Sequence, residues 1–346
     1  MRISCFKKII SLVTAALMLA ALVPGCAKAA KRTVSWFEYF DTVITLTAYT
    51  EDAVSFKEAA EETEEVFRRY HRLFDIYNEY EDIVSLAAVN RLAGESVQVD
   101  PELIELIELG RRFEELTGGA VNIAMGAVLS LWHDARTAAE AGGPAGTPDP
   151  ALLQEAAKHC GISDVQTDRA ASRVRLADEG MSLDVGAIAK GFAADRAAEK
   201  LKARGFPFLL NCGGAVLAYG EKPGGVSWTA GIADPKGSGG FAATVELNGE
   251  ALSTSGSYLR SFTVDGVEYG HIIDPETLFP AELDGAEGER LASVSVKCGG
   301  EGCACLADAL STACWIMGAE RGAELVKRVG ASAVFILADG ETISVP

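Results

Sequence analysis

Basic residues are scarce in this chain, in which 31 Lys and Arg stand against 49 Asp and Glu and give a formal net charge of −18. A protein that binds nucleic acid needs a basic face for the phosphate backbone, so this balance argues against nucleic acid as a partner. Internal repeats and low-complexity tracts are also absent from the sequence. Small anionic ligands stay open, because a metal ion and local backbone amides can bind a pyrophosphate on an acidic protein.

Apolar runs of the roughly 20 residues needed to span a bilayer are lacking beyond the N-terminus. There, residues 9–23 form one apolar run behind three basic residues, and Gly25 precedes Cys26. This layout is expected of a secretory signal, and it resembles a bacterial lipoprotein signal in which the cysteine is acylated. A plain signal peptide or a short membrane anchor is the alternative. We therefore expect a signal peptide over residues 1–25, a tether over 26–39, and a lipid anchor on Cys26 that holds the protein at the cell membrane, facing outside the cytoplasm.

The cysteines could form disulfides, and the spacing from Cys298 to Cys305 also raises the question of a metal site. The cysteines beyond Cys26 are Cys160, Cys212, Cys298, Cys303, Cys305 and Cys314. Outside the cytoplasm they could pair as disulfides, although one sequence does not give the pairing. The spacing from Cys298 to Cys305 matches neither the C-x2-C pairs of zinc sites nor the ferredoxin runs. A loop disulfide or free thiols therefore explain these cysteines better than a metal does.

Hydrophobic periodicity and turn residues predict a series of elements. They are a strand over 43–49, a helix whose apolar stripe runs from Phe56 to Phe74, a helix opened by Asp100-Pro101 and closed by Gly118-Gly119, a surface loop over 142–150, a helix over 305–317, and a hairpin of 331–337 with 342–345. An aspartate before a first-turn proline and a glycine after the last turn are typical helix boundaries. The pattern predicts a single α+β domain over residues 40–346, with a mostly antiparallel sheet and flanking helices.

The segment Met181–Phe192 has the pattern of a buried strand that passes through a glycine turn into a helix. Asp184 and Lys190 gather where the two elements would meet. Helix-opening amides and the positive end of the helix dipole attract anions, so such a junction can hold a phosphate-bearing cofactor. The same junction is common in proteins that bind nothing there.

Asp308 and Thr312 are four residues apart on a predicted helix, so both oxygens project from one face. A hard cation such as Mg2+ binds an octahedron of oxygens, often from one or two carboxylates, substrate phosphates and water. The pair can therefore be part of a Mg2+ site, with an ordinary helix-surface pair as the alternative.

Five ordered segments give the chain a family resemblance. They are Asp184-Val-Gly-Ala-Ile-Ala-Lys190-Gly191, Asn211-Cys-Gly-Gly214, Thr254-Ser-Gly256, His271-Ile-Ile-Asp-Pro275 and Asp308-Ala-Leu-Ser-Thr312. From about Phe40 to the C-terminus the sequence resembles the ApbE family, the FAD:protein FMN transferases. The resemblance implies the same α+β fold, with FAD as substrate.

The resemblance also implies a set of ligand-binding residues. Those that would contact FAD are Asp184, Lys190 and Ile272, with Phe40, Tyr77, Ala120, Val121 and Asn122 near the flavin or the adenine. Thr254 and Ser255 could supply hydroxyls to the ligand, although a tight strand turn would use the same residues. The implied Mg2+ ligands are Asp308, Thr312 and the backbone carbonyl of Ala187, and Ser311 beside them could join.

His271 is the candidate general base. In the family the acceptor is a Thr or Ser hydroxyl, which is a poor nucleophile until a base accepts its proton. A strand-end histidine satisfied by the backbone is the alternative. The other histidines, His71, His133 and His159, lie in helical contexts without acid partners, so we expect structural roles for them.

Two departures from the family pattern fall at turns. The family's methionine-glycine-threonine is Phe40-Asp41-Thr42 in this chain, and its aspartate-proline-x-threonine-glycine ends in Leu278 instead of glycine. The first makes the assignments near the flavin weaker. The second is expected to alter how the loop beside His271 folds.

Taken together, the resemblance implies a Mg2+-dependent FAD:protein FMN transferase. Such an enzyme cleaves the FAD pyrophosphate, leaves FMN on a Thr or Ser of an exported or membrane redox flavoprotein of the FMN-binding-domain type, and releases AMP. A pyrophosphatase giving FMN and AMP would use the same site with water in place of the hydroxyl. A lipoprotein that only captures FAD is a third possibility, against which intact Asp308, Thr312 and His271 argue, since capture needs neither metal nor base.

Overall fold

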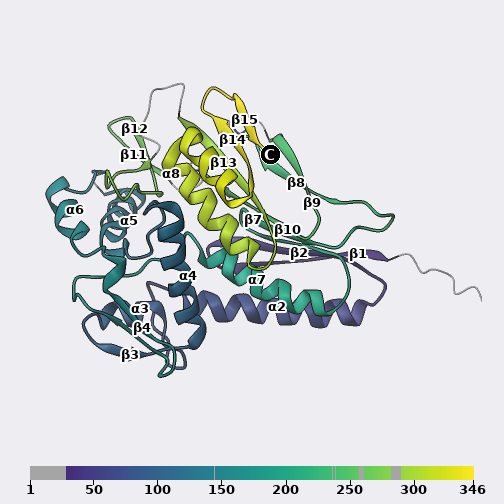
Figure 1. Ribbon diagram of the computed structural model, residues 1–346, viewed down its shortest axis with the longest axis horizontal. Coiled ribbons are helices and arrows are strands. Elements are labelled where there is room, and N and C mark those ends of the chain that lie inside the picture. The colour runs from purple at the N-terminus through teal and green to yellow at the C-terminus, as the bar shows by residue number, and fades with distance from the viewer. Residues whose placement is uncertain (1–28, 144, 236, 238, 257–260, 282–289) are drawn as a thin grey trace, which may run out of the picture.

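The computed structural model describes residues 29–143, 145–235, 237, 239–256, 261–281 and 290–346 (Figure 1). The expected signal peptide and Cys26 lie outside the described residues. None of the helices within these ranges combines the length and the apolar character needed to cross a membrane.

An eight-stranded sheet forms the centre of the fold, and every neighbouring pair in it is antiparallel. In spatial order its strands are β1 (Ala30–Tyr39), β2 (Thr42–Thr50), β6 (Phe208–Cys212), β7 (Ala215–Tyr219), β10 (Glu250–Ser255), β13 (Leu291–Gly299), β14 (Ser332–Leu337) and β15 (Thr342–Val345). The hairpin predicted at the C-terminus is present as β14 and β15. The structure therefore confirms the predicted α+β class and the mostly antiparallel sheet.

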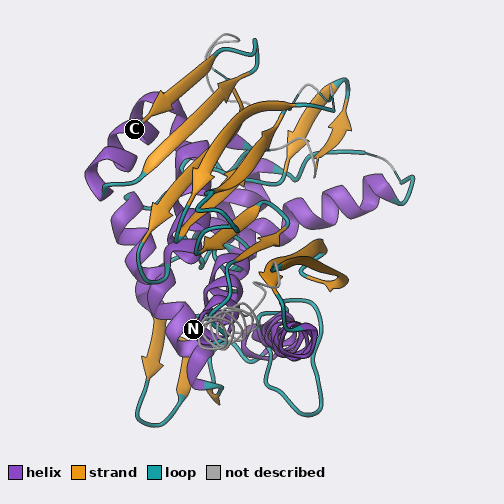
Figure 2. Cartoon of the chain, turned by 90° about the vertical axis from the view of Figure 1, so that its right-hand side faces the viewer, coloured by secondary structure: helices purple, strands orange, loops and turns teal. Residues whose placement is uncertain are grey.

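Three long helices pack on the large sheet and on one another (Figures 1 and 2). They are α2 (Ala53–Leu73), α7 (Ala189–Ala203) and α8 (Cys303–Val329). Helix α2 begins at Asp52, whose side chain accepts hydrogen bonds from two backbone amides of the first turn. Helix α8 runs past the predicted end at residue 317, through a kink at Gly318 where φ is 78° and ψ is 176°. Between α2 and α8 lies α7, so the two helix contacts fix its position.

Most of the other elements gather at one end of the large sheet (Figure 1). They are α3 (Leu86–Arg91), α4 (Pro101–Thr117), α5 (Gly126–Glu140), α6 (Pro150–Ala157), the 3-10 turn η1 (Ile162–Asp164), a small sheet of β3 (Ser96–Gln98), β5 (Arg173–Leu176) and β4 (Val165–Asp168), and the hairpin of β11 (Ser261–Val264) and β12 (Val267–Gly270). A separate hairpin, β8 (Trp228–Ala233) with β9 (Phe241–Leu247), packs beside β7 and β10. Helix α4 has the predicted boundaries, since Asp100 caps its first turn and Gly118, at φ 62°, ends it.

Two segments differ from the sequence prediction. Residues 30–39, expected to belong to the tether, form the edge strand β1. The segment Met181–Val185 is largely buried but is not a strand. Its backbone bonds to distant groups instead: the Asn90 side chain donates to the carbonyl of Leu183 and accepts from its amide. Partners of this kind leave no periodic trace in the local sequence, which is why the strand prediction was wrong.

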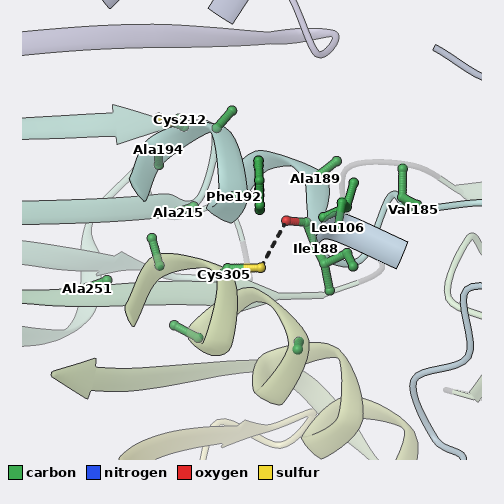
Figure 3. Close-up of a cluster of buried hydrophobic side chains, with 14 of the residues drawn as sticks. Leu106, Val185, Ile188, Ala189, Phe192, Ala194, Cys212, Ala215, Ala251 and Cys305 are labelled. Atoms are coloured by element: carbon green, nitrogen blue, oxygen red, sulfur yellow. Dashed lines mark hydrogen bonds between the residues drawn. The ribbon is translucent and has the colours of Figure 1, made fainter. Parts of the chain in front are cut away.

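The core fills the space between the large sheet and its helices, and Figure 3 shows the part between α7 and α8. Phe192 of α7 is buried there, and the Cys305 thiol of α8 donates to the carbonyl of Ile188 across 3.6 Å. Every cysteine in the described part of the chain is a free thiol, and all but Cys160 are buried. Of the alternatives left open by the sequence, free thiols are therefore the one found.

Candidate active site

A cavity of about 850 Å³ lies where the large sheet, α7 and α8 meet the helical end of the molecule. Its volume falls within the range of small-molecule and cofactor sites. The predicted FAD and base residues that line it are Phe40, Tyr77, Ala120, Val121, Asn122, Asp184, Lys190, Thr254, Ser255, His271 and Ile272, and the predicted metal ligands that line it are Ala187, Asp308 and Thr312. The ordered motifs of the sequence thus converge on one cavity.

Asp308 is the buried acid of this cavity, with only 4% of its surface exposed. Its Oδ2 accepts a hydrogen bond of 2.7 Å from the Gly191 amide, and its Oδ1 accepts one of 2.5 Å from the Ser253 hydroxyl. The Lys190 ammonium lies 3.9 Å from Oδ2. A buried carboxylate without such partners would be strongly destabilising. These contacts with α7 and β10 therefore fix the side chain of Asp308 on α8.

Ser311, which could have joined a metal site, is not among the residues that line the cavity. It is 1% exposed, its hydroxyl hydrogen-bonds to the Asp308 carbonyl at 3.0 Å, and Ser255 donates to it at 2.9 Å. Thr312 does line the cavity, and its hydroxyl donates to the same carbonyl at 3.2 Å. The structure thus brings Thr312, but not Ser311, to the cavity together with Asp308.

The junction of α7 and α8 sets the position of Asp308. A Cβ atom on Gly191 would lie 2.3 Å from the carbonyl oxygen of Ala304, so only glycine allows the two helices to approach this closely. Asp195 of α7 accepts hydrogen bonds from the amides of Ala304 and Cys305, which open α8, at 3.1 and 2.9 Å. Burial raises the pKa of Asp195 to about 6. One side chain of α7 therefore holds the first turn of the helix that carries Asp308.

The turn before α7 is closed by Asp184, whose Oδ1 accepts a 2.8 Å hydrogen bond from the Gly186 amide. Burial raises the pKa of Asp184, while the hydrogen bond from that amide and the charge of Lys190 oppose the rise. Lys190 reaches back to the Gly186 carbonyl at 3.4 Å. Ala189 and Lys190, the first residues of α7, both line the cavity, so the positive end of the helix dipole faces it.

The segment at residues 120–122 forms a braced wall of the cavity. The Val121 amide donates to the hydroxyl of Thr117 at 3.0 Å. The Asn122 side chain accepts from the Ala124 amide at 2.8 Å and donates to the Cys160 carbonyl at 3.0 Å. Both ends of the Asn122 side-chain amide therefore bind the backbone, one within its own loop and the other in the segment after α6.

An aromatic pair stands at the edge of the cavity. Tyr77 is 62% exposed, and its ring lies 4.9 Å from the ring of His133, measured between centroids. Asp75 accepts hydrogen bonds from the amides of Tyr77 and Asn78, at 2.7 and 3.0 Å, and so fixes the loop that carries Tyr77. Arg136 donates to Nδ1 of His133 at 3.2 Å. Such a surface suits a flat aromatic ligand.

The histidines other than His271 differ from the sequence expectation. His71 and His133 both line the cavity, and Nδ1 of His71 accepts from the Phe40 amide at 3.3 Å. His159 has an acid partner, since its Nδ1 lies 2.6 Å from Oδ2 of Asp178, and this hydrogen bond lowers the pKa of Asp178. The expectation that His159 lacks an acid partner was therefore wrong. Nothing in their helical settings signalled that His71 and His133 would face the ligand cavity.

The two departures from the family glycines keep the backbone geometry that glycine favours. Leu278 has φ 64°, and its amide donates to the Asp274 carbonyl at 2.8 Å in the loop that follows His271. Phe40 and Asp41 have φ values of 55° and 50°. These angles lie in the left-handed region, which costs a residue other than glycine about 1–2 kcal/mol. The prediction that Leu278 alters how the loop beside His271 folds stays a prediction.

The cavity provides hard oxygen donors of the kind that Mg2+ binds. The described residues hold no group of three or more His, Cys, Asp or Glu side chains that could cage a metal. The predicted donors that line the cavity are the carboxylate of Asp308, the hydroxyl of Thr312 and the backbone of Ala187. Mg2+ commonly takes one or two carboxylates and fills the remaining positions with substrate phosphates and water. Each oxygen of Asp308 accepts one hydrogen bond from the protein and so has a lone pair left for a cation.

Comparison with known proteins gives consistent results. The sequence model of the ApbE family matches residues 40–336. A relative from Treponema pallidum named FAD:protein FMN transferase is 38% identical over 293 residues, which are 80% of this chain and 77% of the relative. A relative of the same name from Rhodobacter capsulatus is 33% identical over 80% of this chain, and the match spans 50% of that relative's length. The crystal structure of the ApbE protein from Thermotoga maritima is similar with a TM-score of 0.79 and 30% identity, covering 91% of this chain and 97% of the other.

The fold and the cavity define a protein with a cofactor-sized site between an antiparallel sheet and two closely packed helices. The family match and the similarity to the Thermotoga maritima structure both extend over nearly all of the described chain. This chain belongs to the ApbE family.

Proposed function

We propose that this chain is an FAD:protein FMN transferase, which moves FMN from FAD to a Thr or Ser hydroxyl of an exported or membrane redox flavoprotein and releases AMP. The observation that carries the proposal is the meeting of Asp308, Lys190 and His271 at one cavity of cofactor size. They come from α8, α7 and the loop after β12, far apart in the sequence. An acid for a cation, a fixed positive charge and a base are the groups that cleavage of a pyrophosphate by a hydroxyl needs.

In this proposal the chain binds FAD through two kinds of contact. The N-terminal end of α7 and the ammonium of Lys190 hold the pyrophosphate, because helix-opening amides and a lysine both favour phosphate oxygens. The pair of Tyr77 and His133 packs against a flat ring of the substrate. Because Asp75 and Asn122 brace the surrounding loops, these contacts are in place before the substrate arrives.

Mg2+ supplies Lewis-acid chemistry when bound, by neutralising phosphate charge that develops as AMP departs. Asp308 provides the charged ligand, and Thr312 and the backbone of Ala187 provide neutral oxygens. The proposal thus accounts for an anionic substrate on a chain with a net charge of −18.

The transfer itself exchanges the phosphoanhydride bond of FAD for a phosphoester bond to the acceptor. The acceptor hydroxyl oxygen attacks the phosphorus of the FMN half, the bond from that phosphorus to the bridging oxygen breaks, and AMP leaves with the bonding electrons. His271 accepts the proton of the hydroxyl. Because a phosphoryl group needs little covalent help from the protein, positioning and charge stabilisation provide most of the rate.

The proposal is tested by incubating the protein with FAD, Mg2+ and a purified FMN-binding-domain acceptor, then weighing the acceptor by mass spectrometry. We expect the acceptor to gain one FMN as AMP appears, and the gain to require Mg2+. Asp308→Ala should abolish it, whereas Asp149→Ala, which removes a carboxylate that caps α6, should not. Release of FMN and AMP with an unmodified acceptor would identify a pyrophosphatase instead. Binding of FAD without cleavage would identify a capture protein.

Anchoring at the membrane belongs to the same proposal and rests on the sequence around Cys26. Acylation there would place the enzyme outside the cytoplasm, beside exported acceptors. A Cys26→Ser variant should lose its lipid and leave the membrane fraction when expressed in its full-length form. If it remains in the membrane as tightly as the parent, a plain transmembrane anchor is the better explanation.

A further inference from the structure

Ser253 makes a contact that its sequence context did not signal. It lies on β10 and is 3% exposed, and its hydroxyl donates a 2.5 Å hydrogen bond to Oδ1 of Asp308. The other oxygen, Oδ2, accepts from the Gly191 amide at 2.7 Å. The two donors come from different elements and bind different oxygens of one carboxylate. Rotation of that carboxylate about its own axis would break both bonds, so together they fix its plane.

A second layer of hydroxyls holds Ser253 and Asp308 in place. Ser311 lies 3.5 Å from the Ser253 hydroxyl and 3.0 Å from the Asp308 carbonyl. Ser255 donates to Ser311 at 2.9 Å. The backbone and the side chain of Asp308 are thus both tied to β10. In this network each oxygen of the carboxylate accepts one hydrogen bond from the protein and keeps one lone pair for a cation.

We infer that Ser253 is the positioning residue that orients the Asp308 carboxylate for a divalent cation. This inference rests on the proposed function, in which Asp308 is the charged ligand of Mg2+. Groups that orient a metal-binding side chain from behind commonly alter metal affinity 10- to 100-fold when they are removed. A hydroxyl is suited to this task because it donates to the carboxylate without adding a charge that would compete with the cation. Ser253 itself is not among the residues that line the cavity, so its effect on the cation would pass through Asp308.

The test measures metal binding directly and uses no turnover. Mn2+ serves as the probe, because carboxylate, carbonyl and water ligands suit Mg2+ and Mn2+ alike. Free Mn2+ is followed by electron paramagnetic resonance while it is titrated into the protein. Ser253→Ala should bind Mn2+ about 10- to 100-fold more weakly than the parent. Ser253→Cys, which keeps a weak donor of similar size, should fall between the two.

Ser293 provides a matched control. It lies on β13 beside β10, is 1% exposed, and its hydroxyl has no hydrogen-bond partner among the described residues. Ser293→Ala therefore removes a buried strand hydroxyl that does not reach Asp308. Its Mn2+ affinity should equal that of the parent. Thermal unfolding of all variants, measured without metal, shows whether a change in affinity follows from a change in stability.

The possible outcomes separate the inference from the function on which it rests. Parental Mn2+ affinity in Ser253→Ala would overturn the inference, and so would an equal loss in Ser293→Ala. If the parent itself binds no Mn2+, or if Asp308→Ala binds it as well as the parent, the metal site of the proposed function fails. A selective loss in Ser253→Ala, with unchanged unfolding temperature and partial recovery in Ser253→Cys, supports the positioning role.

Discussion

The indole Nε1 of Trp132 donates a hydrogen bond of 2.9 Å to the carbonyl of Leu278, and both side chains are only 4% exposed. This bond joins α5 to the loop that follows His271. Leu278 also belongs to the same apolar cluster as Trp132, so its side chain anchors the loop from within. Because Leu278 adopts φ 64° in doing so, the loop carries backbone strain that the buried side chain offsets.

Substitutions of Leu278 separate the stabilising effect of its buried side chain from the cost of its left-handed backbone. Leu278→Ala loses the buried side chain, at a cost of about 2–5 kcal/mol for such a site, and keeps the strained backbone. Leu278→Gly loses the same contacts but relieves the strain, so it should be more stable than the alanine variant by about 1 kcal/mol. Urea unfolding of both variants measures the difference.

Leu153 of α6 is a control from the same cluster, and it is 1% exposed. Its backbone is helical, so Leu153→Gly should be less stable than Leu153→Ala by about 1 kcal/mol. The glycine variant is thus expected to be more stable than the alanine variant at position 278 and less stable at position 153. The same order at both would show that the left-handed angle at residue 278 carries no strain.

Gly191 gives a second prediction, because it permits the close contact of α7 with α8. In Gly191→Ala the added Cβ would meet the Ala304 carbonyl at 2.3 Å and the Cys305 Cα at 2.6 Å, so the helices must separate. Overpacking of this kind typically costs about 1–3 kcal/mol. The separation should also lengthen the hydrogen bond from Gly191 to Asp308 and weaken metal binding. Gly146→Ala, where the new atom meets nothing within 4 Å, should leave both the unfolding free energy and Mn2+ affinity unchanged.

The sequence predicted best those features that short-range chemistry determines. Asp100 before Pro101 and Gly118 after Thr117 marked the ends of α4 because capping groups lie within four residues of the amides and carbonyls that they satisfy. The segment Met181–Val185 has its partners at Asn90 and Ile123, and no local pattern records pairings over such separations.

Some residues of the site could likewise be identified from the sequence, whereas others could not. Most of the residues that the family resemblance identified line the cavity, including Asp308 and Thr312, although the resemblance did not give their orientation. Ser311 differs from Thr312 by one helical position, which is enough to place it against β10 instead of in the cavity. Ser253 and His133 were missed because a serine in a strand and a histidine in a helix are ordinary residues until the fold places Asp308 or Tyr77 beside them.

His271 gives a prediction that separates catalysis from binding. If it accepts the acceptor's proton, His271→Ala should bind FAD as the parent does, because in the proposed function the pyrophosphate is held by Lys190, helix amides and the metal. Transfer should fall by about 10²- to 10⁴-fold, the usual effect of losing a general base. The parent's rate should decrease toward acid pH as the imidazole becomes protonated, and the variant should lose that decrease. FAD binding by fluorescence and transfer rates across pH measure the two effects.

His159→Ala serves as the control, because His159 pairs with Asp178 and is not among the residues that line the cavity. It should transfer FMN at the parental rate under conditions in which it is folded. Parental transfer in His271→Ala would instead assign the base to a carboxylate, with Asp274 the first to examine.

The raised pKa of Asp195 predicts how the unfolding free energy depends on pH in metal-free buffer. Burial raises its pKa from 3.8 to about 6 in the folded protein. A raised carboxyl pKa means that the folded state holds the proton more tightly than the unfolded state does. The contribution of Asp195 to stability is therefore fully present below pH 3.8 and is lost as pH rises through about 6. The shift of about two pKa units corresponds to a loss of about 3 kcal/mol.

Asp195→Asn isolates this contribution from those of the other acids. The asparagine side chain keeps one acceptor for the first turn of α8 and does not ionise. The unfolding free energy of the variant therefore lacks the contribution of Asp195 ionisation at every pH. The parent's unfolding free energy, measured relative to this variant by urea titration, should decline by about 2.4 kcal/mol between pH 4 and pH 7. Loss of one of the two hydrogen bonds to Ala304 and Cys305 shifts the difference by a constant and leaves its slope unchanged. A difference that stays flat over this range would mean that Asp195 ionises in the folded protein as readily as in water.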